Sequence, residues 1–152
     1  LQASVRRNRL LLTNFIEEVI RYDGPVKCTN RLAVRTTTIG GIEIKAGTTV
    51  SLFLGAANRD PKQFDNPTQF KLDRSGAKRH LGFGRGVHTC IGMPLARAEV
   101  KAALNGIFDR LEDIRLDENL HGNSSDRHFQ YEAVYSLRAL KSLHLEFSQG
   151  DV

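Results

Sequence analysis

A glycine-rich segment that contains a cysteine carries the clearest chemical signal in this chain. Residues 83–92 read FGRGVHTCIG, and the apolar spacing downstream predicts that a helix begins soon after Cys90. Glycines let a backbone take positive φ angles and approach a flat ligand closely. The N–H groups and the dipole at a helix N-terminus favour the thiolate form of a neighbouring cysteine. A thiolate in such a loop suits the axial position of a haem iron.

Two other interpretations of Cys90 stay open. It can be a nucleophile with His88 or His80 as its base, although neighbours in sequence seldom form a catalytic pair and no third orienting group is evident. It can also be a small buried apolar residue, which is a common role of a free cysteine. A dinucleotide site is excluded, because Thr89 stands where that fingerprint requires its third glycine.

Hydrophobic spacing predicts two helices that would position this loop. The first is expected over residues 14–22, where Asn14 can cap the start and the apolar stripe consists of Phe15, Ile16, Val19 and Ile20. The second is expected over residues 94–112, with Pro94 in its first turn and an apolar stripe of Val100, Ala103, Leu104, Ile107, Phe108 and Leu111.

The remaining segments are predicted to be short strands and loops. β-branched residues and glycine turns at positions 40–41 and 47 indicate strands within residues 31–54. Residues 55–82 are expected to be irregular, and a loop of that length in a compact domain is usually functional. Residues 117–130 are expected to be a polar loop, and the alternation at residues 143–147 predicts strands over residues 131–147.

Composition is typical of a soluble globular domain. The 152 residues are 40% hydrophobic and 26% charged, and they contain no apolar run of the ~18 residues that a membrane-spanning helix needs. Two cysteines are too few for a disulfide scaffold, so Cys28 is expected to be a free thiol. We therefore predict a cytoplasmic protein with no membrane partner.

Positive charge gathers around the cysteine segment. Residues 71–110 contain three acidic side chains and eight basic ones, which are Lys71, Arg74, Lys78, Arg79, Arg85, Arg97, Lys101 and Arg110. Few aromatic residues are interleaved with them, which argues against a nucleic-acid partner. A solvated surface and a docking face for an acidic protein both fit this pattern.

Residues 83–92 resemble the cysteine-loop signature of cytochrome P-450 haem-thiolate monooxygenases. The signature is Phe, Gly, any residue, Gly, any, basic, any, Cys, any, Gly, and every fixed position matches. The resemblance implies that Cys90 is the axial ligand of the iron of haem b, iron protoporphyrin IX. It also implies that His88 and Arg31 pair with the haem propionates, and that the other haem contacts come from Phe83, Gly84, Gly86 and Gly92.

Other segments resemble bacterial members of the same family. Glu18 and Arg21 look like the E-x-x-R pair of the helix that supports the haem loop, which implies a buried strut, whereas helical periodicity alone predicts an exposed i,i+3 pair. Residues 57–61 resemble a turn of the bacterial members, and residues 66–70 resemble the segment that usually brings a second arginine to this pair. Gln69 occupies that position, which argues against a full three-residue salt-bridge network but permits a hydrogen bond from Gln69 to Glu18.

The resemblance also implies the architecture. The fold class is α+β within the mainly-α cytochrome P-450 fold, with small sheets, an irregular meander and a C-terminal β-hairpin around residues 137–140. Family members are more than twice as long, and residue 1 is not Met. We therefore expect residues 1–152 to be the C-terminal haem-binding portion, without the distal oxygen-activating helix and inactive alone.

The implied reaction is O2-dependent monooxygenation of a small organic substrate. Electrons would come from a ferredoxin-like or flavin redox partner that docks near residues 71–110. The positions that correspond to a substrate-near segment are Val26, Lys27, Val134 and Leu137, and their identities do not name the substrate. A remnant that keeps the fold but not the haem is the remaining alternative.

Overall fold

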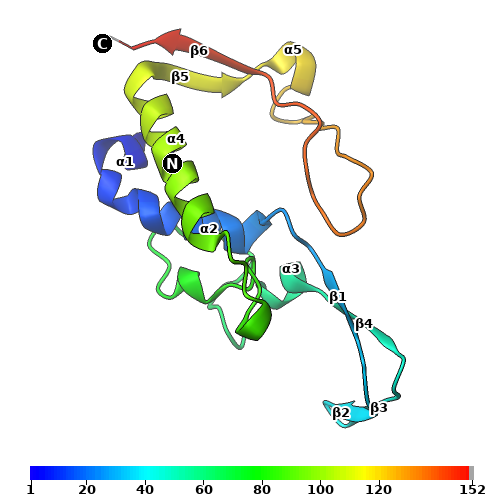
Figure 1. Cartoon of the computed structure of the whole chain (residues 1–152). Helices are drawn as coiled ribbons and strands as arrows, with labels where there is room; N and C mark the ends of the chain where they lie inside the picture. Colours follow the sequence, from blue (N-terminus) through cyan, green and yellow to red (C-terminus); the bar gives the residue numbers. More distant parts are fainter. Residues whose placement is uncertain (151–152) are drawn as a thin grey trace.

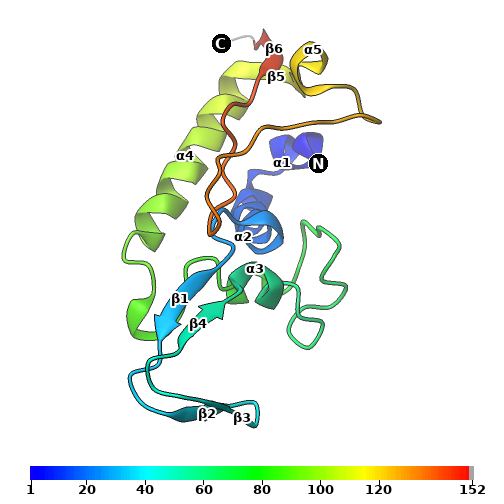
Figure 2. The same ribbon diagram turned by 90° about the vertical axis from the view of Figure 1, so that its right-hand side faces the viewer.

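The computed structural model describes residues 1–150 and has two long helices, α2 and α4, that cross near the centre of the molecule (Figures 1 and 2). The other elements are short. The helices and helical turns are α1 (Gln2–Arg7), η1 (Arg9–Leu11), α2 (Leu12–Asp23), α3 (Leu54–Ala57), η2 (Ala77–Arg79), η3 (Gly86–His88), α4 (Met93–Arg110) and α5 (Glu118–His121). The strands are β1 (Thr29–Leu32), β2 (Thr37–Ile39), β3 (Ile42–Ile44), β4 (Thr49–Leu52), β5 (Leu111–Leu116) and β6 (Leu145–Gln149).

Helix α2 confirms the helix predicted over residues 14–22, but its polar side is buried as well as part of its apolar side. Its fully buried side chains include Glu17, Glu18 and Arg21, whereas Val19 of the predicted apolar stripe is 39% exposed. The irregular segment over residues 58–79 covers the polar face with hydrogen-bond partners. The apolar face contributes Ile16 to the core and lines a cavity, so periodicity alone was wrong about the polar face, which it predicted to be exposed.

The apolar core is small and joins the N-terminal helices to α4. Val5, Leu12 and Ile16 are buried, and Leu104 and Phe108 of α4 pack against them. Helix α4 itself has no buried residue among those described. The predicted helix over residues 94–112 is therefore confirmed, but most of its apolar stripe does not lie in a closed interior.

The predicted strands within residues 31–54 form a narrow ribbon that extends away from the helices (Figure 1). β1 pairs with β4 in antiparallel register, and β2 pairs with β3. Gly40 and Gly41 connect β2 to β3 with φ angles of +57° and +82°. Two adjacent positive φ angles are what a tight hairpin turn requires, so the predicted turn is confirmed.

The C-terminal region differs most from the prediction. β6 pairs with β5, a strand that lies partly inside the predicted second helix, and α5 lies inside the predicted polar loop. Residues 131–140 are not regular strands, although an isolated antiparallel bridge joins Tyr131 to Leu140. Of the strands expected over residues 131–147, only β6 is regular. Within residues 1–150, no helix is long and apolar enough to cross a bilayer.

Candidate functional site

A cavity of about 720 Å³ lies between α2, α4, β1 and the cysteine loop. Its walls are mainly apolar, with Phe15, Val19 and Ile20 from α2 and Val100 and Leu104 from α4. The structure brings six residues singled out from the sequence into its lining, namely Cys90, Phe83, Gly84, His88, Arg31 and Val26. Gly86 and Gly92 belong to the same loop but do not line the cavity.

The cysteine loop is closed by backbone hydrogen bonds. The Cys90 N–H donates to the Phe83 carbonyl at 2.8 Å, and the Thr89 N–H donates to the Gly86 carbonyl at 3.0 Å. Gly84 and Gly86 have φ angles of +70° and +78°, a region that favours glycine. The side chain of Cys90 is exposed at the wall of the cavity. The loop therefore presents its thiol toward an apolar space.

The helix N-terminus does not supply the sulfur contacts that the sequence predicted. Helix α4 begins at Met93, whose N–H donates to the Cys90 carbonyl at 3.2 Å. Among residues 1–150, no N–H group donates a hydrogen bond to the Cys90 Sγ. Gly92, just before this helix, lies beside the sulfur, since a Cβ added there would be 3.8 Å from the Sγ.

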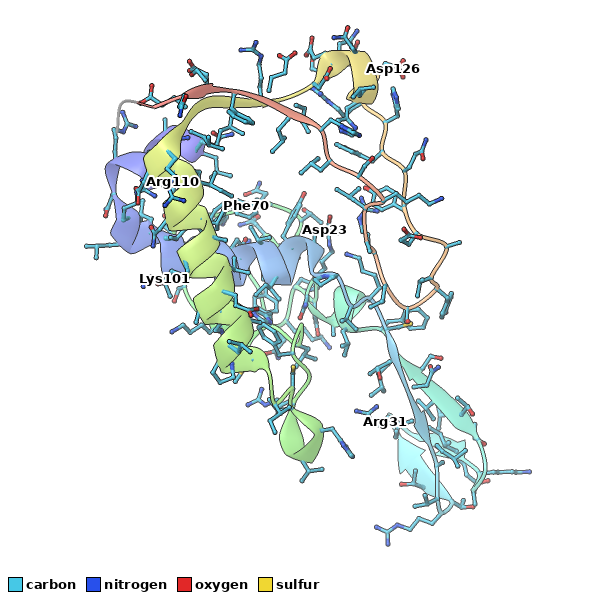
Figure 3. All side chains as sticks on the ribbon, turned by 45° about the horizontal axis from the view of Figure 1, so that its top comes forward. Asp23, Arg31, Phe70, Lys101, Arg110 and Asp126 are labelled. Carbon is cyan, nitrogen blue, oxygen red and sulfur yellow. The ribbon has the colours of Figure 1, made fainter. Side chains whose placement is uncertain are left out.

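Two basic side chains lie on the same cavity as the thiol. Arg31 projects from β1 toward the side on which the cysteine loop lies (Figure 3), and His88 is in the loop itself. The Arg31 Nη1 donates to the Asn30 carbonyl at 2.8 Å and to the Thr29 Oγ1 at 3.2 Å. No carboxylate within residues 1–150 forms a salt bridge with Arg31.

This set of groups fits a haem. An exposed thiol can bind iron, apolar walls suit a porphyrin ring, and a guanidinium suits a carboxylate. Glycine at the loop positions next to the thiol leaves room for a flat ring. Within residues 1–150, no three or more His, Cys, Asp or Glu side chains are grouped so that they could hold a metal ion.

Glu18, Arg21 and Arg74 form a buried salt-bridge network behind the cavity. The Arg21 Nε donates to the Glu18 Oε2 at 2.6 Å, and the Arg74 Nε donates to the Glu18 Oε1 at 2.8 Å. The Lys71 N–H donates a further hydrogen bond to this carboxylate at 3.0 Å. Burial alone would raise the pKa of Glu18, but these donors outweigh it and lower that pKa.

Arg74 corrects the expectation about Gln69. The three-residue network is complete because Arg74, five residues further along the chain, supplies the second guanidinium. Gln69 contributes its backbone carbonyl, which accepts hydrogen bonds from Arg21 at 3.1 Å and from Arg74 at 2.7 Å. The irregular segment thus turns its carbonyls toward two buried cations, an arrangement that apolar periodicity cannot reveal.

A second buried carboxylate, Glu17, was missed at the sequence level. It accepts two hydrogen bonds from Arg97 of α4, at 2.6 and 2.8 Å, and one from the His80 Nε2 at 3.0 Å. Burial raises the pKa of Glu17, and the bonds to Arg97 and His80 lower it below its usual value. Because Gly82 N–H donates to the His80 Nδ1 at 3.0 Å, both ring nitrogens are engaged. His80 is therefore not available as the base of a Cys90 nucleophile.

The residues assigned to the substrate side come together near the end of α2. Val26 forms an isolated antiparallel bridge with Leu137, and the Lys27 N–H donates to the Ser136 carbonyl at 2.8 Å. Of the four predicted residues, Val26 lines the cavity, whereas Lys27, Val134 and Leu137 do not. The Lys27 Nζ pairs with Asp23 at 2.5 Å.

The basic segment is less basic at the surface than its sequence suggested. Arg74 is 5% exposed, and Arg74 and Arg97 are both bound to carboxylates. The other six basic side chains are Lys71, Lys78, Arg79, Arg85, Lys101 and Arg110. Lys71 also pairs with Asp65, at 3.3 Å. The free positive charge near Cys90 is thus smaller than the count over residues 71–110.

The fold and the site fit a haem whose iron is bound by a thiolate. Comparisons agree, because the family model for cytochrome P450 matches residues 1–119. The chain belongs to the cytochrome P450 family, whose cofactor is a haem-thiolate and whose members include monooxygenases of the bacterial type.

Individual relatives place the chain among bacterial members. It is 44% identical to the putative cytochrome P450 140 of Mycobacterium tuberculosis, covering 74% of this chain and 26% of that protein. It is 44% identical to the 6-deoxyerythronolide B hydroxylase of Saccharopolyspora erythraea, covering 75% of this chain and 28% of that protein.

A solved structure covers nearly the whole chain. The substrate-free cytochrome P450 CYP150A6 of Mycobacterium marinum is 49% identical with a TM-score of 0.96, over 99% of this chain and 37% of that one. The chain therefore spans about a quarter to a third of the length of the curated relatives it matches.

Proposed function

We propose that Cys90 is the axial ligand of a haem b held in the cavity between α2 and α4. The observation that carries this proposal is the exposed Cys90 thiol on the wall of an apolar cavity that also presents Arg31 and His88. When bound, the haem supplies the oxygen-activating chemistry of the family. The protein supplies the thiolate, the charge partners and an apolar enclosure.

Each lining residue has a distinct part in this proposal. Phe83 covers the thiolate side of the ring and limits water there. Arg31 and His88 bind the two propionates, and the Arg31 guanidinium, which forms no salt bridge within residues 1–150, suits a carboxylate in particular. Gly84 and Gly86 give the loop its positive φ angles, and Gly92 keeps it small in cross-section near the sulfur.

We propose that the complete protein is a cytoplasmic monooxygenase of a small organic substrate, and that residues 1–152 form its C-terminal haem-binding portion. One oxygen atom of O2 enters the substrate, and the other leaves as water after uptake of two electrons and two protons. The part of the protein over the distal face of the haem lies outside this chain, so we expect the chain alone to be inactive. Val26, Lys27, Val134 and Leu137 would lie on the substrate side.

A ferredoxin-like or flavin partner would deliver the electrons near residues 71–110. The exposed Arg85 and Lys78, close to the cysteine loop, would steer an acidic partner. Charge attraction of this kind weakens with salt. Reduction of the complete protein by its partner should therefore slow between low and high ionic strength, and a rate independent of ionic strength would argue against this docking face.

The test of the haem site is a titration of the purified chain with haem. We expect a Soret band that saturates at one haem per chain, and we expect Cys90→Ala to lose the thiolate spectrum. Cys28→Ala is the matched control, because Cys28 is a free but buried thiol. A colourless wild-type chain whose Cys90 reacts with thiol probes would contradict the proposal.

A further inference from the structure

One buried carboxylate connects both ends of the cysteine loop. Glu17 is 1% exposed and lies on the polar face of α2. Upstream of the loop it binds the His80 Nε2 at 3.0 Å, and downstream it binds Arg97 of α4 through two hydrogen bonds. Residues 80 and 97 enclose the whole segment that holds Cys90. Glu17 therefore joins both flanks of the loop to α2, and the Leu81 N–H donates separately to the Asn58 Oδ1 at 2.7 Å.

His80 connects Glu17 to the backbone at Gly82, next to the cysteine loop. The Gly82 N–H donates to the His80 Nδ1 at 3.0 Å, so this nitrogen carries no proton and the Nε2–H is the donor to Glu17. Burial lowers the pKa of His80, although Glu17 opposes this shift, so the fold favours the neutral ring. Helix α2 also packs closely on Gly82, where an added Cβ would lie 2.4 Å from the Ile20 Cγ2.

The next residue continues the connection to the cysteine. The Phe83 ring lies between the His80 ring, with centroids 5.9 Å apart, and the Arg97 guanidinium, 5.0 Å from its centroid. The Phe83 carbonyl accepts the Cys90 N–H at 2.8 Å. Glu17, His80 and Arg97 thus hold Phe83, and the Phe83 carbonyl fixes the backbone of Cys90.

We propose that Glu17, His80 and Arg97 are positioning residues that set the Cys90 thiolate against the haem. This inference rests on the proposed function of Cys90. The two nitrogens of His80 have separate tasks: Nδ1 holds the loop through Gly82, and Nε2 connects the ring to Glu17. The hydrogen bond from the Gly82 N–H to the His80 Nδ1 acts directly on the loop. Glu17 does not depend on His80 alone, because Arg97 also binds it.

Two substitutions separate these tasks. Asparagine at position 80 can place an acceptor oxygen where Nδ1 lies, and glutamine can place a donor amide where Nε2 lies. We expect His80→Asn to keep the loop in place and His80→Gln to release it. His128→Gln, at a histidine outside this cluster, is the control for the loss of a ring.

The first measurement needs no haem. Amide hydrogen exchange of the chain should show the Cys90 N–H exchanging about tenfold faster in His80→Gln than in the wild type, and by less than about threefold in His80→Asn. The amides of β5 and β6 report general stability and should change equally little in both variants. Equal acceleration at Cys90 and in β5 and β6 would assign His80 a merely structural role and overturn the proposal.

The second measurement uses the haem-loaded chain. His80→Gln should lose most of the red-shifted thiolate Soret band of the reduced carbon monoxide complex, and His80→Asn should keep it. Should both His80 variants fail to fold, Arg97→Lys provides the same test, since lysine keeps the charge but cannot bind Glu17 through two nitrogens. An Arg97→Lys chain with wild-type Cys90 exchange and spectrum would overturn the proposal. A wild-type chain that binds no haem would contradict the haem site instead, while the exchange data would still test the positioning residues.

Discussion

Replacement of Glu18 by glutamine tests the buried network most strictly. The wild-type carboxylate accepts hydrogen bonds from Arg21, from Arg74 and from the Lys71 N–H. The side chains of Glu18 and Arg21 are 0% exposed, and that of Arg74 is 3% exposed. Glu18→Gln keeps the shape of the side chain but leaves two buried guanidinium groups without a counter-charge.

The expected cost is large for a chain of this size. Removing one partner of a buried ion pair costs about 3–5 kcal/mol. With a urea dependence of roughly 2 kcal/mol per molar, the unfolding midpoint should fall by about 1.5–2.5 M. Far-UV circular dichroism during urea unfolding measures this change, and in the complete protein Glu18→Ala should abolish haem incorporation.

An exposed ion pair provides the matched control. Glu146 accepts a hydrogen bond from Arg115 at 2.8 Å between β6 and β5, with side chains 43% and 68% exposed. Glu146→Gln should therefore cost no more than about 1 kcal/mol. If Glu18→Gln costs as little as Glu146→Gln, the network does not hold the irregular segment on α2, and the reasoning about buried charge fails.

Three further predictions concern pH, packing and the propionate contact. The pKa of His80 is lowered from 6.5 in the fold, so the unfolded chain binds a proton at a higher pH than the folded chain does. The free energy of unfolding should therefore decrease as pH falls below about 6.5. In urea titrations at pH 7.5 and 5.5, His80→Asn should flatten this decrease. Gly82→Ala should cost about 1–3 kcal/mol in the same unfolding assay, because its Cβ would overlap the Ile20 side chain, and an unchanged midpoint would refute that close packing. Arg31→Gln should weaken haem affinity about tenfold in haem titrations. The control Arg35→Gln, at an exposed position outside the cavity lining, should not weaken it. If both variants bind haem with equal affinity, Arg31 is not part of the site.

The sequence predicts the parts of the site that depend on local pattern. The spacing of residues 83–92 singled out Cys90 and its glycines, and the apolar spacing of α2 and α4 located the two helices that flank the cavity. The turn at Gly40 and Gly41 was also predictable, since few other residues tolerate two positive φ angles. Each of these features is encoded within about twenty consecutive residues.

Features that depend on distant contacts were not predictable from local pattern. Glu17 and Arg97 lie 80 residues apart, and nothing in either neighbourhood indicates that they pair. Arg74 replaced the arginine expected at position 69 because an irregular backbone can bring a nearby side chain to the same carboxylate. Residues 131–140 were predicted to be strands but form isolated bridges instead, Tyr131 with Leu140 and Leu137 with Val26, because few backbone hydrogen bonds connect them.

The most direct test of the central claim is the absorption spectrum of the haem-loaded, reduced chain under carbon monoxide. Ligation by Cys90 predicts the red-shifted Soret band of a thiolate-bound haem, present in the wild type and in Cys28→Ala and lost in Cys90→Ala. A Cys90→Ala chain that keeps this band would contradict the account, because the iron would then have a different thiolate ligand.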